Sequence, residues 1–142
     1  MLRVEPEILA NYVATGQVKL AFHHVLDHGN SALLHQAAEC AAEQAPAAFW
    51  SMHDLLFENQ NDLFRADSAA VAGLATGMGL DGPALQSCVD SDRYAEKVQR
   101  MDQARRAAGI RLRPSFDING AVYEGAQPFP NFVAVFGGIL GQ

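Results

Sequence analysis

The spacing of apolar positions predicts a short helix and then a strand at the start of the chain. From Pro6 to Thr15 the apolar side chains recur at helical spacing. Gly16 ends this helix, because glycine tolerates the left-handed conformation just past a helix terminus. From Gln17 to His24 apolar and polar positions alternate with a period of two, which is typical of a strand.

The spacing of apolar residues within 31–108 predicts helices and no strand. Ser31 is a suitable N-cap, and Pro46 suits the first turn of a helix, where its missing N–H costs little. Gly79 and Gly109 follow apolar stretches at positions typical of helix ends. The pattern therefore predicts an all-helical block, with helices at 31–44, from 46 onward, 68–78, 82–90 and 92–108.

The last part of the chain predicts a hairpin and a closing helix. Asn119-Gly120 is the pair that most strongly favours a two-residue hairpin turn, because both residues accept positive φ. The pair predicts antiparallel strands at 115–119 and 121–124. Apolar side chains then recur at helical spacing from Phe129 to Leu140.

Composition narrows the class of protein. The chain has 142 residues, which suits one domain, and no apolar run approaches the ~20 residues that cross a bilayer. Its net charge of −6 repels phosphate backbones, so nucleic acid is not an expected partner. Seven of the ten basic residues nevertheless lie between Arg93 and Arg113, and alternating charge there favours a solvated helix face.

The order of helix, strand, helical block, proline, hairpin and helix resembles the thioredoxin fold with the helical insertion of the DsbA family. That family consists of thiol–disulfide oxidoreductases. Residues 12–18, 49–60 and 114–129 are most similar to it, with Phe-Trp-Ser-Met-His-Asp-Leu-Leu-Phe and Pro-Ser-Phe-Asp-Ile-Asn-Gly as the most specific stretches. The resemblance implies an α/β fold, with a thioredoxin-like core at 1–30 and 109–142 and an insertion at 31–108.

The resemblance also implies a piece that the sequence does not contain. In the family a strand and a C-x-x-C precede the position of Pro6, and here only five residues do. We expect the first, central strand to be missing, which leaves the strands at 17–24 and 115–119 without a direct neighbour. The expected explanations are, in order, a fragment of a longer protein, a homodimer that fills the slot, and a rearranged sheet.

The two cysteines are not expected to be nucleophiles. A reactive thiolate is favoured at a helix N-terminus, whereas Cys40 and Cys88 lie inside predicted helices and neither belongs to a C-x-x-C. We therefore expect no catalytic residue within the 142. The resemblance implies a structural disulfide between Cys40 and Cys88, and two separate buried thiols are an equally weighted alternative.

Pro114 is the residue most strongly tied to function by the resemblance, which implies a cis proline that faces the active disulfide. Arg113, Pro114 and Ser115 are accordingly the predicted substrate-binding residues, because the exposed backbone beside such a proline can pair with an extended peptide. Arg113 would favour a nearby thiolate. The family usually has Gly-Thr before the proline, whereas this chain has Leu112-Arg113. The plainer alternatives are a trans proline and a surface arginine.

The five histidines show no trustworthy metal-ligand spacing, and His53 on an apolar helix face suggests a core histidine. The sequence likewise has no glycine-rich phosphate loop and no nucleophile elbow. We therefore expect neither a metal nor a cofactor.

Three functions remain open. The first is a DsbA-like oxidoreductase domain that exchanges disulfides with protein thiols, inactive by itself because it lacks the nucleophile. The second is a redox-dead module that binds peptides or a partner, and the third is a glutathione-using relative of the same superfamily. The resemblance implies an extracytoplasmic location, periplasmic or in the cell envelope; the cysteine count alone fixes no compartment.

Overall fold

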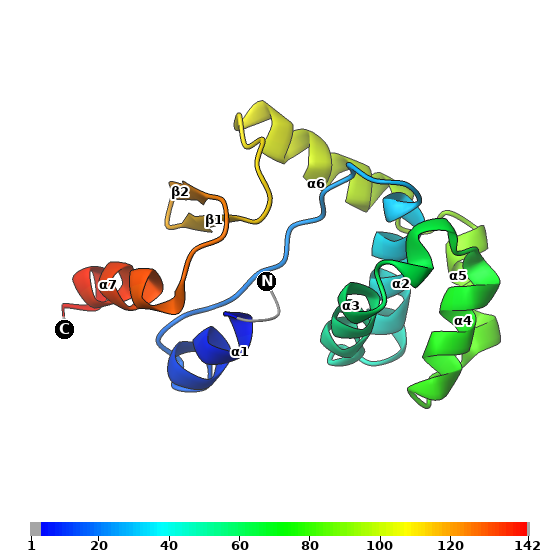
Figure 1. The fold of residues 1–142 in the computed structure, drawn as a ribbon. Helices are drawn as coiled ribbons and strands as arrows, with labels where there is room; N and C mark the ends of the chain where they lie inside the picture. Colours follow the sequence, from blue (N-terminus) through cyan, green and yellow to red (C-terminus); the bar gives the residue numbers. More distant parts are fainter. Residues whose placement is uncertain (1–3, 142) are drawn as a thin grey trace. The chain divides into compact units, whose positions relative to one another are not determined.

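The computed structural model describes residues 4–141, which form two compact units (Figure 1). One unit combines the N-terminal residues up to Phe22 with the C-terminal residues from Arg105 onward, and the other contains His23–Ala104. We call them the sheet unit and the helical unit. The predicted boundaries of the insertion at 31 and 108 stay a prediction, because compactness does not show which part was inserted.

The helical unit confirms the predicted all-helical block. Its last helix begins at Ala95 and not at 92, because Asp92 has a left-handed φ of 52° that a helix does not accommodate. The sequence did not predict the short 3₁₀ helix. The elements are α2 (Ser31–Gln44), α3 (Ala48–Glu58), η2 (Asp62–Arg65), α4 (Ser68–Gly77), α5 (Gly82–Asp90) and α6 (Ala95–Ala107), the last of which continues past Ala104.

Local chemistry sets where α4 and α5 begin and how closely they pack. Asp67 and Asp81 are the N-caps, and each side chain accepts a hydrogen bond from the backbone N–H three residues later, at 2.9 and 2.8 Å. Gly82 lies against α4 so closely that a Cβ would be 2.5 Å from the carbonyl oxygen of Ala72. Only glycine permits this approach.

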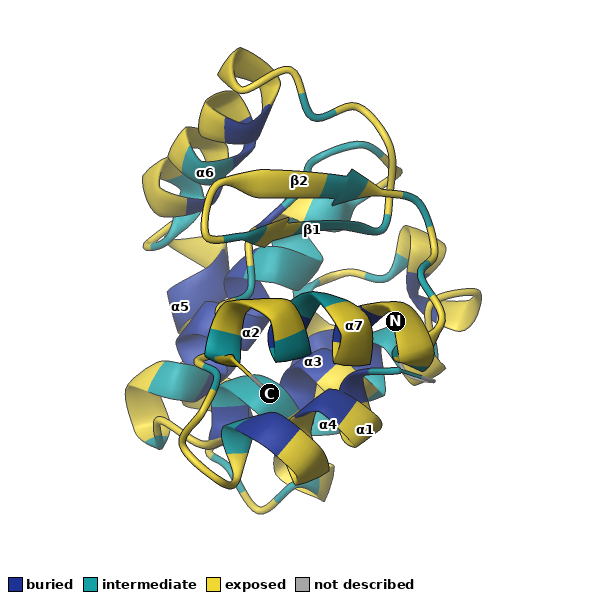
Figure 2. Cartoon of the chain, turned by 90° about the vertical axis from the view of Figure 1, so that its left-hand side faces the viewer, coloured by how far each residue is buried: buried dark blue, intermediate teal, exposed yellow. Residues whose placement is uncertain are grey.

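The core of the helical unit lies among α2, α3, α4 and α5. Met52, Val71 and Leu85 come from three different helices and are fully buried. Figure 2 colours the buried residues of these helices dark blue, most visibly on α5. Each fully buried side chain of this size stabilises the folded state by roughly 1.5–3 kcal/mol relative to exposure.

The two ends of the helical unit are joined to each other by hydrogen bonds. The His23 Nε2–H donates to the carbonyl oxygen of Met101 at 2.6 Å, and the backbone N–H of Leu26 donates to Asp102 Oδ1 at 2.9 Å. The segment that enters this unit therefore runs beside α6, the helix that leaves it.

The sheet unit contains two helical segments and a hairpin around an aromatic core. The Tyr12 and Phe136 rings meet edge to face at 4.8 Å between centroids, and Phe116 and Phe132 do so at the same distance. The elements are α1 (Glu5–Ile8), a π-helical turn η1 (Leu9–Val13), β1 (Ser115–Ile118), β2 (Ala121–Glu124) and α7 (Phe129–Leu140). The first helix, the hairpin and the closing helix are thus confirmed.

The predicted strand at 17–24 is wrong. Within the described residues the sheet has two strands, β1 and β2, which pair antiparallel with Ser115 opposite Glu124 and Ile118 opposite Ala121. A strand requires a neighbour to satisfy its backbone groups, and none of the described strands lies along residues 17–24. Alternating apolar residues were therefore not enough to produce a strand.

The hairpin turn has the predicted chemistry. Asn119 and Gly120 have φ angles of 52° and 91°, and Asp117 Oδ1 accepts a hydrogen bond from the Gly120 N–H at 2.7 Å. Among the described residues, no helix has both the length and the apolar composition needed to cross a bilayer.

Candidate functional site

The candidate site is the loop between α6 and β1, residues 108–114, which we call the proline loop. The Arg113–Pro114 peptide bond is cis, which is the geometry that the resemblance implied. Arg113 is exposed, whereas Pro114 and Ser115 are half-buried. The Ser115 hydroxyl donates to the carbonyl oxygen of Leu112 at 2.6 Å, so the three predicted residues form one continuous bend.

Glu124 joins the proline loop to the hairpin. Its Oε1 accepts hydrogen bonds from two successive backbone N–H groups, at 3.1 Å from Arg111 and 3.4 Å from Leu112. The Gly125 N–H donates to the carbonyl oxygen of Pro114 at 2.8 Å, which extends the hairpin ladder by one step. The carboxylate at the end of β2 thus holds the loop that precedes β1.

Sequence reasoning missed Glu124, although a signal was present. A two-residue turn at Asn119-Gly120 pairs Ile118 with Ala121, and counting outward from it places Glu124 opposite Ser115. Glu124 is therefore the acidic residue that the hairpin register brings to the proline loop.

The base of the loop is shaped by Arg105. Only 6% of Arg105 is exposed, and its Nη1–H donates to the carbonyl oxygen of Ile110 at 3.1 Å. The backbone N–H of Ile110 in turn donates to the carbonyl oxygen of Arg105 at 3.1 Å, which closes the end of α6. These contacts set the direction in which the chain leaves the helix.

The two cysteines form a disulfide within the helical unit. The Cys40 and Cys88 sulfurs are 1.99 Å apart, and the bond joins α2 to α5. The residues are 2% and 3% exposed, and no cysteine of the described chain is free. This resolves the choice between a disulfide and two separate thiols in favour of the disulfide. Neither sulfur is available as a nucleophile in this state. The structure therefore does not test the expected effect of Arg113 on a thiolate, which stays a prediction.

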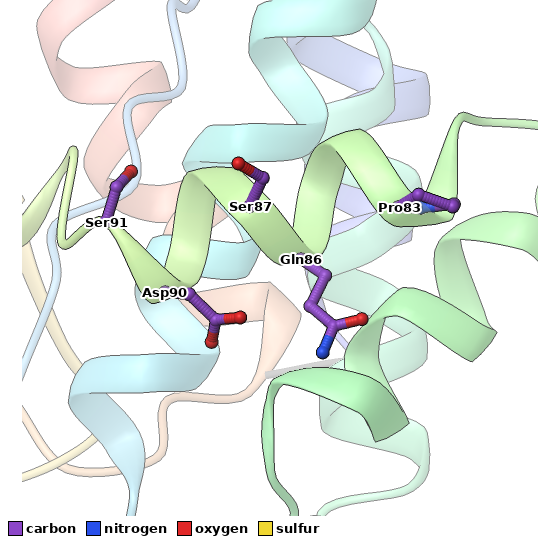
Figure 3. A pocket seen from close by; sticks show the side chains of 5 residues that line it. All are labelled: Pro83, Gln86, Ser87, Asp90 and Ser91. Atoms are coloured by element: carbon purple, nitrogen blue, oxygen red, sulfur yellow. The ribbon is translucent and has the colours of Figure 1, made fainter.

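A shallow, open hollow lies over α5 but does not have the features of a reaction site. The side chains of Gln86 and Asp90 point to one side of the helix and those of Ser87 and Ser91 to the other, as Figure 3 shows. Because its polar groups diverge and do not converge on one point, we assign the hollow no function.

A buried polar network in the helical unit was not predicted. The His24 Nε2–H donates to Glu39 Oε1 at 2.7 Å, and the Lys97 ammonium donates to Glu39 Oε2 at 2.6 Å. The network joins α2, through Glu39, both to the segment that contains His24 and to α6, which contains Lys97. His53 is 2% exposed and lies 3.0 Å from Asp54 Oδ1, which confirms it as a core histidine.

Burial and hydrogen bonds shift two pKa values in this network. Burial, with the nearby His24 as the second cause, lowers the pKa of His35 to about 4. Burial alone would raise the pKa of Glu39, but hydrogen bonds from His24 and Lys97 outweigh it and lower that pKa below the ordinary value. His35 is therefore neutral and Glu39 ionised near pH 7.

A family model described as thioredoxin matches residues 2–135. The chain belongs to the thioredoxin family. Its fold is that of crystalline oxidised BdbD from Bacillus subtilis, with a TM-score of 0.85 over 96% of this chain and 76% of that one, at 23% identity. The predicted thioredoxin-like fold with a DsbA-like helical insertion is confirmed.

This thioredoxin-family chain is similar to parts of a disulfide bond formation protein and of a Na⁺/H⁺ antiporter. Disulfide bond formation protein D of Bacillus subtilis is 27% identical over 121 residues, which are 82% of this chain and 54% of that protein. The Na⁺/H⁺ antiporter NhaA 3 of Salinispora tropica is 29% identical over 84% of this chain, but over only 18% of its own length. The chain thus spans about half of the first relative and less than a fifth of the second.

The disulfide should contribute strongly to the stability of this thioredoxin-family chain. Cys40 and Cys88 are 48 residues apart in sequence, and closing a loop of that length stabilises by about 4 kcal/mol in the chain-entropy model. The double variant Cys40→Ala/Cys88→Ala should lose a free energy of unfolding of this order in urea. Reductant should destabilise the unsubstituted chain and leave the variant unchanged. Two titratable thiols in the denatured, unreduced chain would contradict the assignment.

Acid should destabilise the helical unit through His35. Between pH 6.5 and about 4 the unfolded chain binds a proton at this histidine that the folded chain does not, so the free energy of unfolding falls as the pH falls. The full loss is about 3 kcal/mol. The lowered pKa of Glu39 acts in the same direction, with stability lost as the pH falls below about 4.5.

Urea unfolding at a series of pH values measures this loss. The variant His35→Gln should show a much flatter dependence between pH 4 and 6.5, whereas His28→Gln, at an exposed histidine, should keep the original slope. An unchanged slope in His35→Gln would remove His35 as the cause.

Proposed function

We propose that this chain is the substrate-holding part of a DsbA-like thiol–disulfide oxidoreductase that acts on protein substrates in an extracytoplasmic compartment. The observation that carries the proposal is the exposed proline loop, which Glu124 ties to a hairpin in a chain of the thioredoxin family. The Cys40–Cys88 disulfide supports the compartment, because structural disulfides persist mainly in oxidising surroundings.

The proline loop would hold substrate through backbone pairing. In an antiparallel ladder the backbone groups of alternate residues point toward the partner strand. The Gly125 N–H bond to Pro114 sets this alternation, so Ser115 and Asp117 direct their N–H and C=O groups away from β2. No strand of residues 4–141 pairs with that edge of β1. An extended peptide or a second copy of the chain has the backbone groups to pair there.

The redox step requires a C-x-x-C, which these 142 residues do not contain. In the oxidising direction a substrate thiolate attacks the C-x-x-C disulfide and forms a mixed disulfide with one of its sulfurs. A second substrate thiolate then attacks the substrate sulfur of that bond. The substrate leaves as a disulfide, and the C-x-x-C has gained two electrons as a dithiol.

A second candidate is a redox-dead module that binds peptides or a partner. The observation that favours it is that both cysteines of the chain are bonded to each other and buried. On this proposal the proline loop binds in the same way, and no electrons are transferred.

Reduction of insulin by dithiothreitol distinguishes the two candidates. The 142-residue chain should give no acceleration, because it offers no accessible thiol pair. The complete product of its coding sequence should accelerate the reaction if the first candidate holds, and should bind peptide without turnover if the second does. Turnover by the 142-residue chain would contradict the structural role of Cys40 and Cys88.

Glu124 gives a direct test of the binding loop. Glu124→Ala leaves the N–H groups of Arg111 and Leu112 without their acceptor, so binding of a labelled extended peptide should weaken by about tenfold, as expected for a charge-assisted hydrogen bond. Glu124→Gln keeps an acceptor oxygen and should retain most of the affinity. Fluorescence anisotropy measures the binding, and circular dichroism checks that both variants fold. Equal affinity of all three chains would exclude the proline loop as the binding surface.

A further inference from the structure

The Cys40–Cys88 disulfide is buried, but a solvent-facing carboxylate lies against one of its sulfurs. The two cysteines are 2% and 3% exposed. Glu43 Oε2 is 3.8 Å from the Cys88 sulfur, while 41% of the Glu43 side chain is exposed. Glu43 therefore contacts the disulfide on one side and water on the other, and it lies between Cys88 and solvent.

Two further side chains hold Glu43 in this place. Arg93 pairs through Nη1 with Glu43 Oε1, and the Tyr94 hydroxyl donates to Glu43 Oε2 at 3.2 Å. Glu43 comes from the end of α2, whereas Arg93 and Tyr94 come from the turn between α5 and α6. We call Glu43, Arg93 and Tyr94 the Glu43 cluster.

The turn that carries Arg93 and Tyr94 is fixed to the backbone of Cys88. The Arg93 N–H donates to the carbonyl oxygen of Cys88 at 3.4 Å, and the Ser91 hydroxyl donates to the same oxygen at 2.9 Å. These bonds keep the turn at the end of α5 where Cys88 lies. The backbone therefore places the partners of Glu43 beside the disulfide.

The ion pair between Arg93 and Glu43 is the part of the cluster that opens most easily. The two side chains are 49% and 41% exposed, so water solvates both charges when they separate. Because exposed ion pairs are weak, the open form is disfavoured by only about fivefold. Opening brings water to Cys88 first, since Cys40 lies within the continuously buried stretch 36–41 of α2.

We propose that the Glu43 cluster is a gate over the disulfide, and that Cys88 is the sulfur at which small thiols react when the gate opens. This inference is independent of the proline loop and of the proposed function. It makes Cys88 a site of reversible modification by a small thiol, and it makes the disulfide a slow redox switch in the helical unit.

The reaction has two steps. A small thiolate attacks Cys88 Sγ, which forms a mixed disulfide and breaks the Cys40–Cys88 bond, and Cys40 leaves as a thiolate that takes a proton from water. A second small thiolate attacks the small-thiol sulfur of the mixed disulfide, and Cys88 leaves in the same way. The two cysteines gain two electrons, and the two small thiols lose them as they form a disulfide.

The carboxylate of Glu43 also favours this direction of attack. A negative charge beside Cys88 disfavours a thiolate at that sulfur, because like charges repel. The cysteine whose thiolate is less favoured is the poorer leaving group, so Cys40 leaves and Cys88 keeps the new bond. Access and charge therefore both select Cys88.

The rate at which dithiothreitol reduces the folded chain tests the gate. Glu43→Ala removes the closing side chain, so the second-order rate constant should rise about fivefold, as expected for the loss of an exposed ion pair. Arg93→Met should give a similar rise. About 0.5 M salt should accelerate reduction of the unsubstituted chain by screening the pair, and should change Glu43→Ala much less.

Gln44→Ala is the matched control, because Gln44 is the next residue of α2 and also joins this helix to the start of α5. Its amide N–H donates to the carbonyl oxygen of Asp81 at 3.0 Å, and its Oε1 accepts from the Asp81 N–H at 2.8 Å. This variant should be reduced at the rate of the unsubstituted chain. Rates that follow the free energy of unfolding across all variants would overturn the gate, because reduction would then proceed through unfolding.

The position of the mixed disulfide tests which sulfur is attacked. The chain is treated with excess glutathione, quenched with N-ethylmaleimide, digested and mapped by mass spectrometry. Glutathione should be found on Cys88 and the maleimide on Cys40. Glutathione on Cys40 would overturn the assignment of Cys88, and equal rates of reduction for Glu43→Ala and the unsubstituted chain would overturn the gate.

Discussion

The hydrogen bonds from two successive N–H groups to the carboxylate of Glu124 are the constraint on which the candidate site depends. They join the loop before β1 to the far end of β2, so the direction of the loop is coupled to the register of the hairpin. A slip of one residue would bring Tyr123 or Gly125 to this place, and neither has a side-chain carboxylate. The turn at the opposite end of the hairpin therefore helps to determine the geometry of the proline loop.

This coupling explains how much of the site could be predicted from sequence. Asn119-Gly120 predicts the hairpin and its register from local backbone preferences alone, and most of the helices follow from their caps and apolar spacing. The strand at 17–24 failed because a strand depends on a neighbour that local alternation does not reveal. The Glu39 network was missed for a related reason. It joins residues 15 and 58 positions apart in sequence, and no spacing rule connects them.

Charged side chains differ in burial between the helical unit and the proline loop. In the helical unit the buried carboxylate of Glu39 contacts the buried His24 and the partly exposed Lys97, and there it holds segments together. Around the proline loop the arginines are mostly exposed, where salt screens them and where each pair contributes little to folding. The first arrangement therefore contributes to the folding of the helical unit, whereas the second is more sensitive to salt.

The bonds of His23 with Met101 and of Leu26 with Asp102 bring the entrance and the exit of the helical unit side by side. Because the ends of this unit meet, removal of the unit would leave only a short gap for the rest of the chain to bridge. The same proximity makes the unit suitable for circular permutation, with its old ends joined by a brief linker and new ends opened in a surface turn.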